Sequence, residues 1–147
     1  MALPPQKFRE IVFQVLYSQG FTSIDPENLI PFMMNELKVT RRVMLDVHNK
    51  VDLVIEKLLG IDEQISAAAT EYSFERISRV ERTILRLAVF ELLHDSTIPP
   101  KVAIAEAVRL CRKFGTPESS QFVNAVLDTI LKKVGDEPAI SNEPAPI

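Results

Sequence analysis

The sequence predicts an all-α protein, and three observations lead to this prediction. Apolar residues recur at helical spacing from Phe8 to Leu131, and 46% of the 147 residues are hydrophobic, which is enough to fill a core. No segment alternates apolar and polar residues as a half-buried strand does, so nothing indicates a sheet. The residues from Ser78 to Leu93 carry an apolar arc wider than half of a helix circumference, which only surrounding helices can bury. We therefore expect a compact seven-helix domain of two helical halves, packed around a central helix at about residues 78–93.

The first expected helix begins at Pro4-Pro5, because the N–H that proline lacks has no partner in a first turn, and it ends before Gly20. Arg9, Phe13 and Tyr17 follow one another at four-residue spacing, opposite the main apolar face. Two interpretations are open. The three residues form a contact strip for RNA or a protein partner, or a second helix covers the two aromatic rings as core.

Three more helices are expected before the central one. Asp25 and Pro26 suit the N-cap and first position of a second helix. Thr40 suits the N-cap of a third helix, which carries a regular apolar stripe and which Gly60 is expected to close. A shorter helix is then expected to begin at Asp62.

The central helix has a clear start signal and two misplaced charges. Ser78 can accept a backbone N–H of the open first turn, and Glu81, three residues later, completes the pattern of a capping box. Both Glu81 and Glu91 project into the apolar arc, where burial of an unpaired carboxylate costs several kcal/mol of stability. We expect the deeper Glu91 to be structural and to pair with an arginine.

Two more helices and a tail are expected after the central helix. The sixth helix opens at Pro99-Pro100, and the last has Thr116 as its N-cap. The sequence beyond the last helix is acidic, contains several prolines and has no apolar face. We therefore predict one domain over residues 1–134 and a disordered tail over residues 135–147.

The composition argues against several classes of function. The formal net charge is −3, whereas a nucleic-acid binder usually carries a basic excess, so any RNA site must be local. The sequence has no CxxC pair, no two histidines at ligand spacing and no glycine-rich phosphate loop. It also shows no combination of a nucleophile with a general base. We therefore expect no catalytic residue, no metal site and no cofactor.

The sequence also bears on location. The longest apolar runs are far too short to span a bilayer, and no signal peptide opens the chain. The single cysteine, Cys111, lies on the apolar side of its expected helix, which is typical of a buried thiol in a reducing compartment. We therefore expect a cytoplasmic protein that does not bind a membrane.

Several segments of the chain resemble one known family. They are Gln14-Val15-Leu16-Tyr17-Ser18, Leu85-Arg86-Leu87-Ala88-Val89-Phe90-Glu91-Leu92, Pro100-Lys101-Val102-Ala103-Ile104 and Phe122-Val123-Asn124-Ala125-Val126-Leu127-Asp128. In their order and spacing they resemble the NusB family of bacterial transcription antitermination factors. The likeness spans nearly the whole chain and implies a fold of three helices followed by four.

The resemblance implies a non-enzymatic adaptor. Such a protein binds the boxA element of nascent ribosomal RNA transcripts together with NusE, a small-subunit ribosomal protein that doubles as an elongation factor. Together they help RNA polymerase to read through terminators. The expected partners of this chain are therefore boxA RNA, NusE and the RNA polymerase elongation complex.

The resemblance further implies an RNA-binding set of Lys7, Arg9, Lys101 and Phe122. The arginine-rich N-terminus of the family is reduced here to the first two of these, so we expect the isolated protein to bind RNA weakly and the partner to strengthen binding. Lys101 stands at a helix start, where its side chain and free backbone N–H groups can reach a phosphate. Phe122 either stacks on an unpaired base, which contributes roughly 1–3 kcal/mol, or is plain core.

For the protein partner, the resemblance implies contacts from Tyr17, Glu75 and Glu81. An interface with NusE explains why Glu81 lies on an otherwise apolar side of its helix. A carboxylate at the rim of an interface can meet a basic group or an N–H of the partner.

Two other functions and one structural question stay open at this stage. Some RNA cytosine methyltransferases carry a similar helical domain, but they need a glycine-rich cofactor loop and a catalytic cysteine that this sequence lacks. A helical protein-only scaffold with little RNA binding of its own is the alternative that the acidic balance favours. The sequence does not distinguish a monomer from a homodimer.

Overall fold

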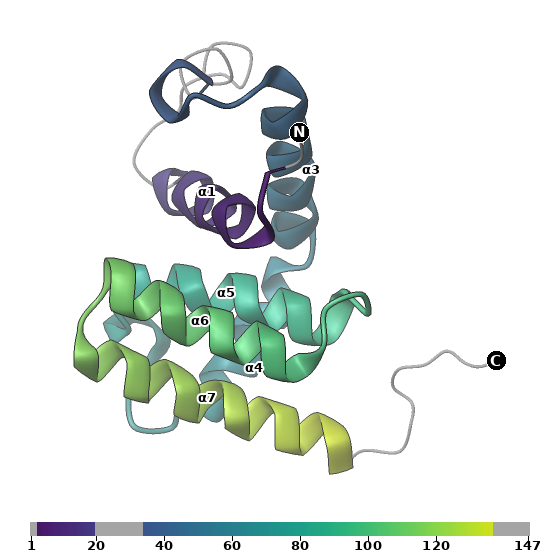
Figure 1. The fold of residues 1–147 in the computed structure, drawn as a ribbon. Helices are drawn as coiled ribbons and strands as arrows, with labels where there is room; N and C mark the ends of the chain where they lie inside the picture. The colour runs from purple at the N-terminus through teal and green to yellow at the C-terminus, as the bar shows by residue number, and fades with distance from the viewer. Residues whose placement is uncertain (1–2, 20–33, 137–147) are drawn as a thin grey trace, which may run out of the picture. The chain divides into compact units, whose positions relative to one another are not determined.

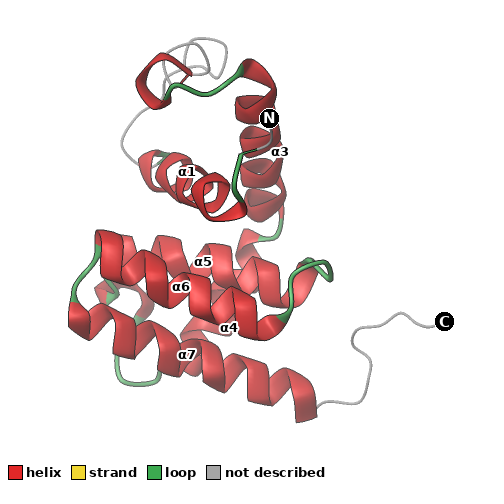
Figure 2. Ribbon diagram, viewed as in Figure 1, coloured by secondary structure: helices red, strands yellow, loops and turns green. Residues whose placement is uncertain are grey.

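The computed structural model describes residues 3–19 and 34–136, and it divides the chain into two compact units, residues 1–58 and 59–147 (Figure 1). Within the described ranges every regular element is a helix, and no strand occurs there (Figure 2). The prediction of an all-α fold is therefore confirmed. The start of the expected second helix at Asp25 and most of the expected tail lie outside the described residues, whereas residues 34–37 are helical.

The first unit is built on α1 (Pro5–Ser18) and α3 (Arg41–Glu56), which pack against each other. Both begin as expected. Pro5 occupies the first turn of α1, and the Val43 N–H donates to Thr40 Oγ1 over 3.2 Å at the start of α3. The inward residues follow at three- and four-residue spacing, as a buried helix face requires. They include Ile11, Val12 and Val15 on α1, and Met44, Val47, Val51 and Val54 on α3.

The boundary between the third helix and the next differs from the prediction. The helix ends at Glu56, and α4 (Leu58–Ala68) begins after a single residue. Lys57 has φ −100° and ψ 9°, and its N–H bonds to the Val54 carbonyl over 3.1 Å in a tightened last turn. Gly60 therefore lies inside a helix rather than closing one, and Asp62 is one turn into α4 rather than at its start.

The second unit holds α4, a short 3₁₀ helix η1 (Phe74–Arg76), α5 (Arg79–His94), α6 (Pro100–Phe114) and α7 (Pro117–Asp136). Helix α5 packs against both α6 and α7, and α6 and α7 pack against each other. The predicted central helix is confirmed, with Ser78 as its N-cap. Its buried residues are Thr83, Ile84, Leu85, Leu87, Ala88, Val89, Phe90 and Glu91.

Glu91 is 1% exposed, which agrees with the expectation of a structural role. None of the helices in the described ranges has the length and apolar character needed to cross a membrane.

Candidate functional site

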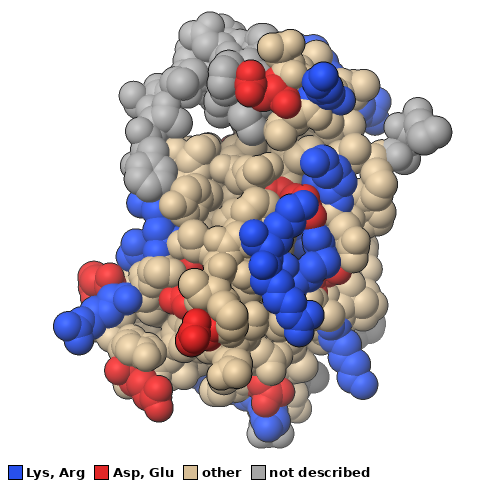
Figure 3. Space-filling model, turned by 60° about the vertical axis from the view of Figure 1, so that its left-hand side comes forward, with Lys and Arg blue, Asp and Glu red and all other residues tan. Residues whose placement is uncertain are grey.

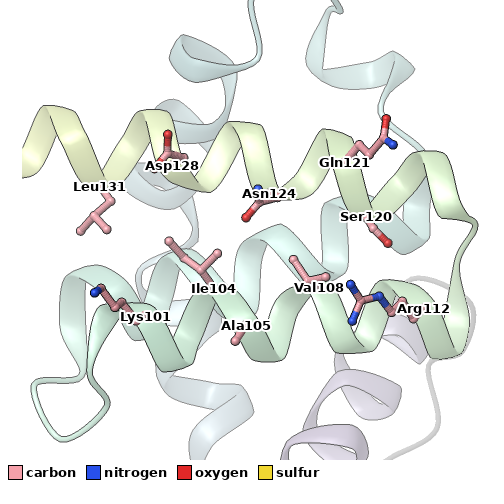
Figure 4. Close-up of a pocket in the computed structure, with 10 residues that line it drawn as sticks. All are labelled: Lys101, Ile104, Ala105, Val108, Arg112, Ser120, Gln121, Asn124, Asp128 and Leu131. Atoms are coloured by element: carbon pink, nitrogen blue, oxygen red, sulfur yellow. The ribbon is translucent and has the colours of Figure 1, made fainter.

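A groove runs between α6 and α7 and encloses about 630 Å³ (Figure 4). We call it the α6–α7 groove. The two helices run in opposite directions, so Lys101 at the start of α6 lies near Leu131, and Arg112 near its end lies beside Ser120 (Figure 4). Both cations are exposed. The residues that line the groove are Lys101, Ile104, Ala105, Val108, Arg112, Ser120, Gln121, Asn124, Asp128 and Leu131.

Positively charged side chains lie together on part of the surface. Figure 3 shows Lys and Arg side chains gathered together on one face, although the formal net charge of the chain is −3. A local basic surface of this kind can attract an anionic partner that the net charge alone would repel.

At Lys101 the side chain is better placed than the backbone to meet a phosphate. The N–H groups of Val102 and Ala103 donate to the Pro99 carbonyl over 3.0 and 3.1 Å. The expectation of free N–H groups there is therefore wrong for these two residues, because the start of the helix tightens onto its own cap.

Phe122 is half-buried on a different side of α7. Its ring meets the Tyr72 ring edge-on, with the ring centroids 5.5 Å apart. It lines a separate pocket of about 190 Å³ together with Ala69, Glu71 and Thr129. Leu131, the neighbour of Lys101, lies roughly 13 Å further along α7 at 1.5 Å per residue. The structure therefore does not bring Lys101 and Phe122 into one pocket.

The N-terminal residues are placed within the first unit. Lys7 is exposed, whereas Arg9 is 8% and Phe13 3% exposed. The Phe13 and Tyr17 rings stack with their centroids 5.9 Å apart, and the Tyr17 side chain is half-buried. The interpretation of both rings as core is therefore confirmed for Phe13 and not for Tyr17, which is only half-buried.

The acidic residues expected to bind a partner lie six positions apart, in η1 and in the first turn of α5. Glu75 is exposed on η1, and Glu81 is half-buried in the first turn of α5. The capping box is confirmed, since the Glu81 N–H donates to Ser78 Oγ over 3.1 Å and the Ser78 N–H donates to Glu81 Oε1 over 3.3 Å. The backbone between the two carboxylates is anchored by Ile77, which is 3% exposed.

The Phe74 side chain contacts the central helix at the other end of this segment, through two arginines that the sequence did not single out. The guanidinium groups of Arg82 and Arg86 lie 5.5 and 5.4 Å from the centre of its ring. Arg86 also donates from Nε and Nη2 to the two carboxylate oxygens of Asp62, each over 2.9 Å. The sequence did not indicate this pairing, because Asp62 and Arg86 are 24 positions apart and lie on different helices.

The thiol of Cys111 lies in the same part of the second unit. Burial, and then the negative charge of Glu81, raise the pKa of Cys111 to about 12. The thiol therefore stays protonated at neutral pH and behaves as a small core residue rather than a nucleophile. Among the described residues there is no cluster of three or more His, Cys, Asp or Glu side chains that could hold a metal ion.

The described residues form an all-α protein with an acidic segment before the central helix and a groove bordered by two exposed cations. The NusB family model matches residues 6–132, and the chain belongs to the NusB family. It is 37% identical over 131 residues to the transcription antitermination protein NusB of Pseudothermotoga lettingae, covering 89% of this chain and 93% of that protein.

Two solved structures share the fold. A structure of T. maritima NusB superposes with a TM-score of 0.78 at 34% identity, covering 90% of this chain and 94% of the other. A crystal structure of the antitermination factors NusB and NusE in complex with dsRNA matches with a TM-score of 0.74 at 27% identity, covering 87% of this chain and 96% of the other.

Proposed function

We propose that this protein is a transcription antitermination factor that binds boxA RNA of ribosomal RNA transcripts together with NusE and aids read-through by the RNA polymerase elongation complex. The observation that carries the proposal is family membership over residues 6–132. The likeness to a NusB that was solved together with NusE and RNA supports both partners. As in an adaptor, the chain contributes binding surfaces rather than chemistry, and we place its action in the bacterial cytoplasm.

On the RNA side, the proposal assigns phosphate contacts to Lys7, Arg9 and Lys101 and a base-stacking contact to Phe122. The exposed Lys101 side chain at the mouth of the α6–α7 groove supports the first kind of contact. The half-buried Phe122 ring supports the second, because part of its surface is open while Tyr72 braces the ring edge-on. Arg9 is largely buried, so it contributes to RNA binding only if its guanidinium reaches the surface.

On the protein side, the proposal assigns the NusE contact to Tyr17, Glu75 and Glu81. The two carboxylates are presented by a segment that is ordered before any partner arrives, and such pre-ordering lowers the entropy cost of association. A complementary basic surface on NusE would then supply specificity and speed of encounter.

A binding assay with boxA RNA, with and without NusE, at two salt concentrations tests this function. We expect weak RNA binding by the protein alone, a marked increase with NusE, and affinity that falls steeply with salt, because phosphate contacts release counterions. Binding of NusE with no salt-dependent RNA binding in either sample would instead support the protein-only scaffold.

A further inference from the structure

The α6–α7 groove has more structure than one RNA contact at Lys101 uses. Arg112 borders its far end, and Ile104, Val108 and Leu131 give it a half-buried apolar floor. The one carboxylate that lines it, on Asp128, is paired with Lys132 Nζ over 3.1 Å. This arrangement suits an extended peptide with an acidic group at each end and an apolar side chain between them.

The spacing of the two cations sets the length of such a peptide. Lys101 and Arg112 are eleven positions apart on one helix, which at 1.5 Å per residue is roughly 16 Å along its axis. An extended chain advances about 3.3 Å per residue, so five or six residues between carboxylates match this distance.

The sequence that follows α7 has this pattern. Residues 137–147 lie outside the described range and beyond residue 132, where the family match ends. They contain Glu137 and Glu143 as their only charged residues, with Ile140 midway between them. Six positions of extended chain reach up to roughly 20 Å, which is enough to span the two cations.

The connection is short enough for the same chain to fill its own groove. Helix α7 forms one wall of the groove and ends at Asp136, five residues beyond Leu131 beside Lys101. Glu137 is six positions beyond Leu131, roughly 9 Å at 1.5 Å per residue, a distance that a lysine and a glutamate side chain can bridge between them.

We propose that residues 137–147 bind back into the α6–α7 groove of their own chain, with Glu137 pairing with Lys101, Glu143 pairing with Arg112 and Ile140 on the apolar floor. Because the segment is tethered beside the groove, its effective concentration is on the order of millimolar, and two exposed ion pairs with one apolar contact suffice for partial occupancy. The proposal that this tail competes with RNA for Lys101 rests on the proposed function, whereas the docking itself does not.

Paramagnetic broadening tests the docking without any RNA. A nitroxide is attached to a Ser141→Cys variant of the full chain, in which the native Cys111 is buried and escapes labelling. At low salt we expect amide signals of the groove-lining residues of α6 and α7 to lose intensity by about two-fold or more, and to recover near 1 M salt, where screening removes exposed ion pairs. Unchanged groove signals, or broadening centred elsewhere, would overturn the proposal.

A matched variant tests the register. Exchanging two residues, as Ala139→Glu with Glu143→Ala, keeps composition and net charge but leaves the two carboxylates only roughly 7 Å apart along an extended chain. We expect this exchange variant to show no broadening of the groove signals, like a second variant that carries Glu137→Gln together with Glu143→Gln. If the exchange retains the broadening, the pairing with both cations is wrong. Labelled protein mixed with isotope-enriched unlabelled protein should show no broadening, since transfer between copies would contradict docking within one chain.

Competition between the tail and RNA is tested in a separate experiment. A chain that ends at Asp136 should bind boxA RNA about two- to four-fold more tightly than the full chain at low salt, because a competitor has been removed. Equal affinities together with positive broadening would overturn the competition but not the docking. Failure of both chains to bind RNA would count against the proposed function alone.

Discussion

The segment that carries Glu75 and Glu81 is held from both ends, whereas the cations of the α6–α7 groove project from helix surfaces into open space. Phe74 lies against two guanidinium groups, Ile77 is buried, and a capping box holds Glu81. Lys101 and Arg112 are exposed on long, adaptable side chains at the two ends of a groove. Under the proposed function the first surface meets a folded protein and the second a flexible polyanion, and these two kinds of partner favour different degrees of order in the surface that binds them.

The physical reason lies in what each partner supplies. A folded protein loses little conformational entropy on binding, and the entropy cost of the complex is lower still when the surface that it meets is already ordered. Single-stranded RNA brings many equivalent phosphates, so mobile cations can find one in several positions.

The largest effect is expected from a change in the segment that carries Glu75 and Glu81. Glu81→Lys should weaken NusE binding by about 1–3 kcal/mol, because a carboxylate that faces a basic partner becomes a repelling charge. Titration calorimetry measures the loss, and Glu118→Lys, an exposed acidic position in the first turn of α7, is the control for net charge. If Glu81→Lys unfolds the protein, its role is structural and the interface assignment is wrong.

The next prediction tests what holds the ordered segment. Arg86→Ala should lower the free energy of unfolding by about 1–2 kcal/mol, since it removes a half-buried, two-bond contact with Asp62 and one cation from the Phe74 ring. Urea unfolding gives the value. A double-mutant cycle with Asp62→Asn should show coupling, whereas a cycle with Asp46→Asn, in the other unit, should be additive.

In the α6–α7 groove, Lys101→Ala should weaken boxA binding by about 1 kcal/mol. It should also reduce the dependence of RNA affinity on salt concentration, the salt slope, by about one phosphate contact. Phe122→Leu should lower affinity with an unchanged slope, because it removes a stacking ring and no charge. Fluorescence titrations across a salt series separate the two. Equal slopes for Lys101→Ala and the unaltered protein would remove Lys101 from the RNA site.

The raised pKa of the buried Cys111 thiol predicts that the stability of the fold depends on pH. The pKa of Cys111 is about 12 in the folded protein against an ordinary value of 9.0, so the fold favours the neutral thiol. The associated stability is complete below pH 9.0 and is lost as the pH rises toward 12, by on the order of 1 kcal/mol per pH unit. Between pH 8 and 10.5, the free energy of unfolding measured with denaturant should therefore fall less steeply with pH for Cys111→Ala than for the native chain.

The smallest effect is expected from the sequence after Gly135. Removing it should shift the melting temperature by no more than about 1–2 °C, because weak, exposed ion pairs contribute little to stability. Calorimetry at low and high salt measures this shift. A loss of many degrees would show that the segment belongs to the core of the second unit.

Much of the fold was predictable because its signals are local. Ser78 and Glu81 form their capping box, Thr40 caps α3 and Pro100 opens α6, since each depends only on residues within one turn. Gly60 misled the prediction of a helix end for the same reason. A glycine is compatible with a helix end but does not cause one, and here the chain turns at Lys57, three residues earlier.

The sequence by itself determined that the chain is helical, where several of its helices begin, which of their faces turn inward and, through its resemblance, the family to which it belongs. Only the tertiary structure decided that Asp62 pairs with Arg86 across 24 positions, that two arginines lie against the Phe74 ring, and that Lys101 and Phe122 line different pockets. Helical periodicity specifies which side of a helix is buried. It does not specify which other helix lies against that side or in what register, because those depend on contacts between residues far apart in the chain.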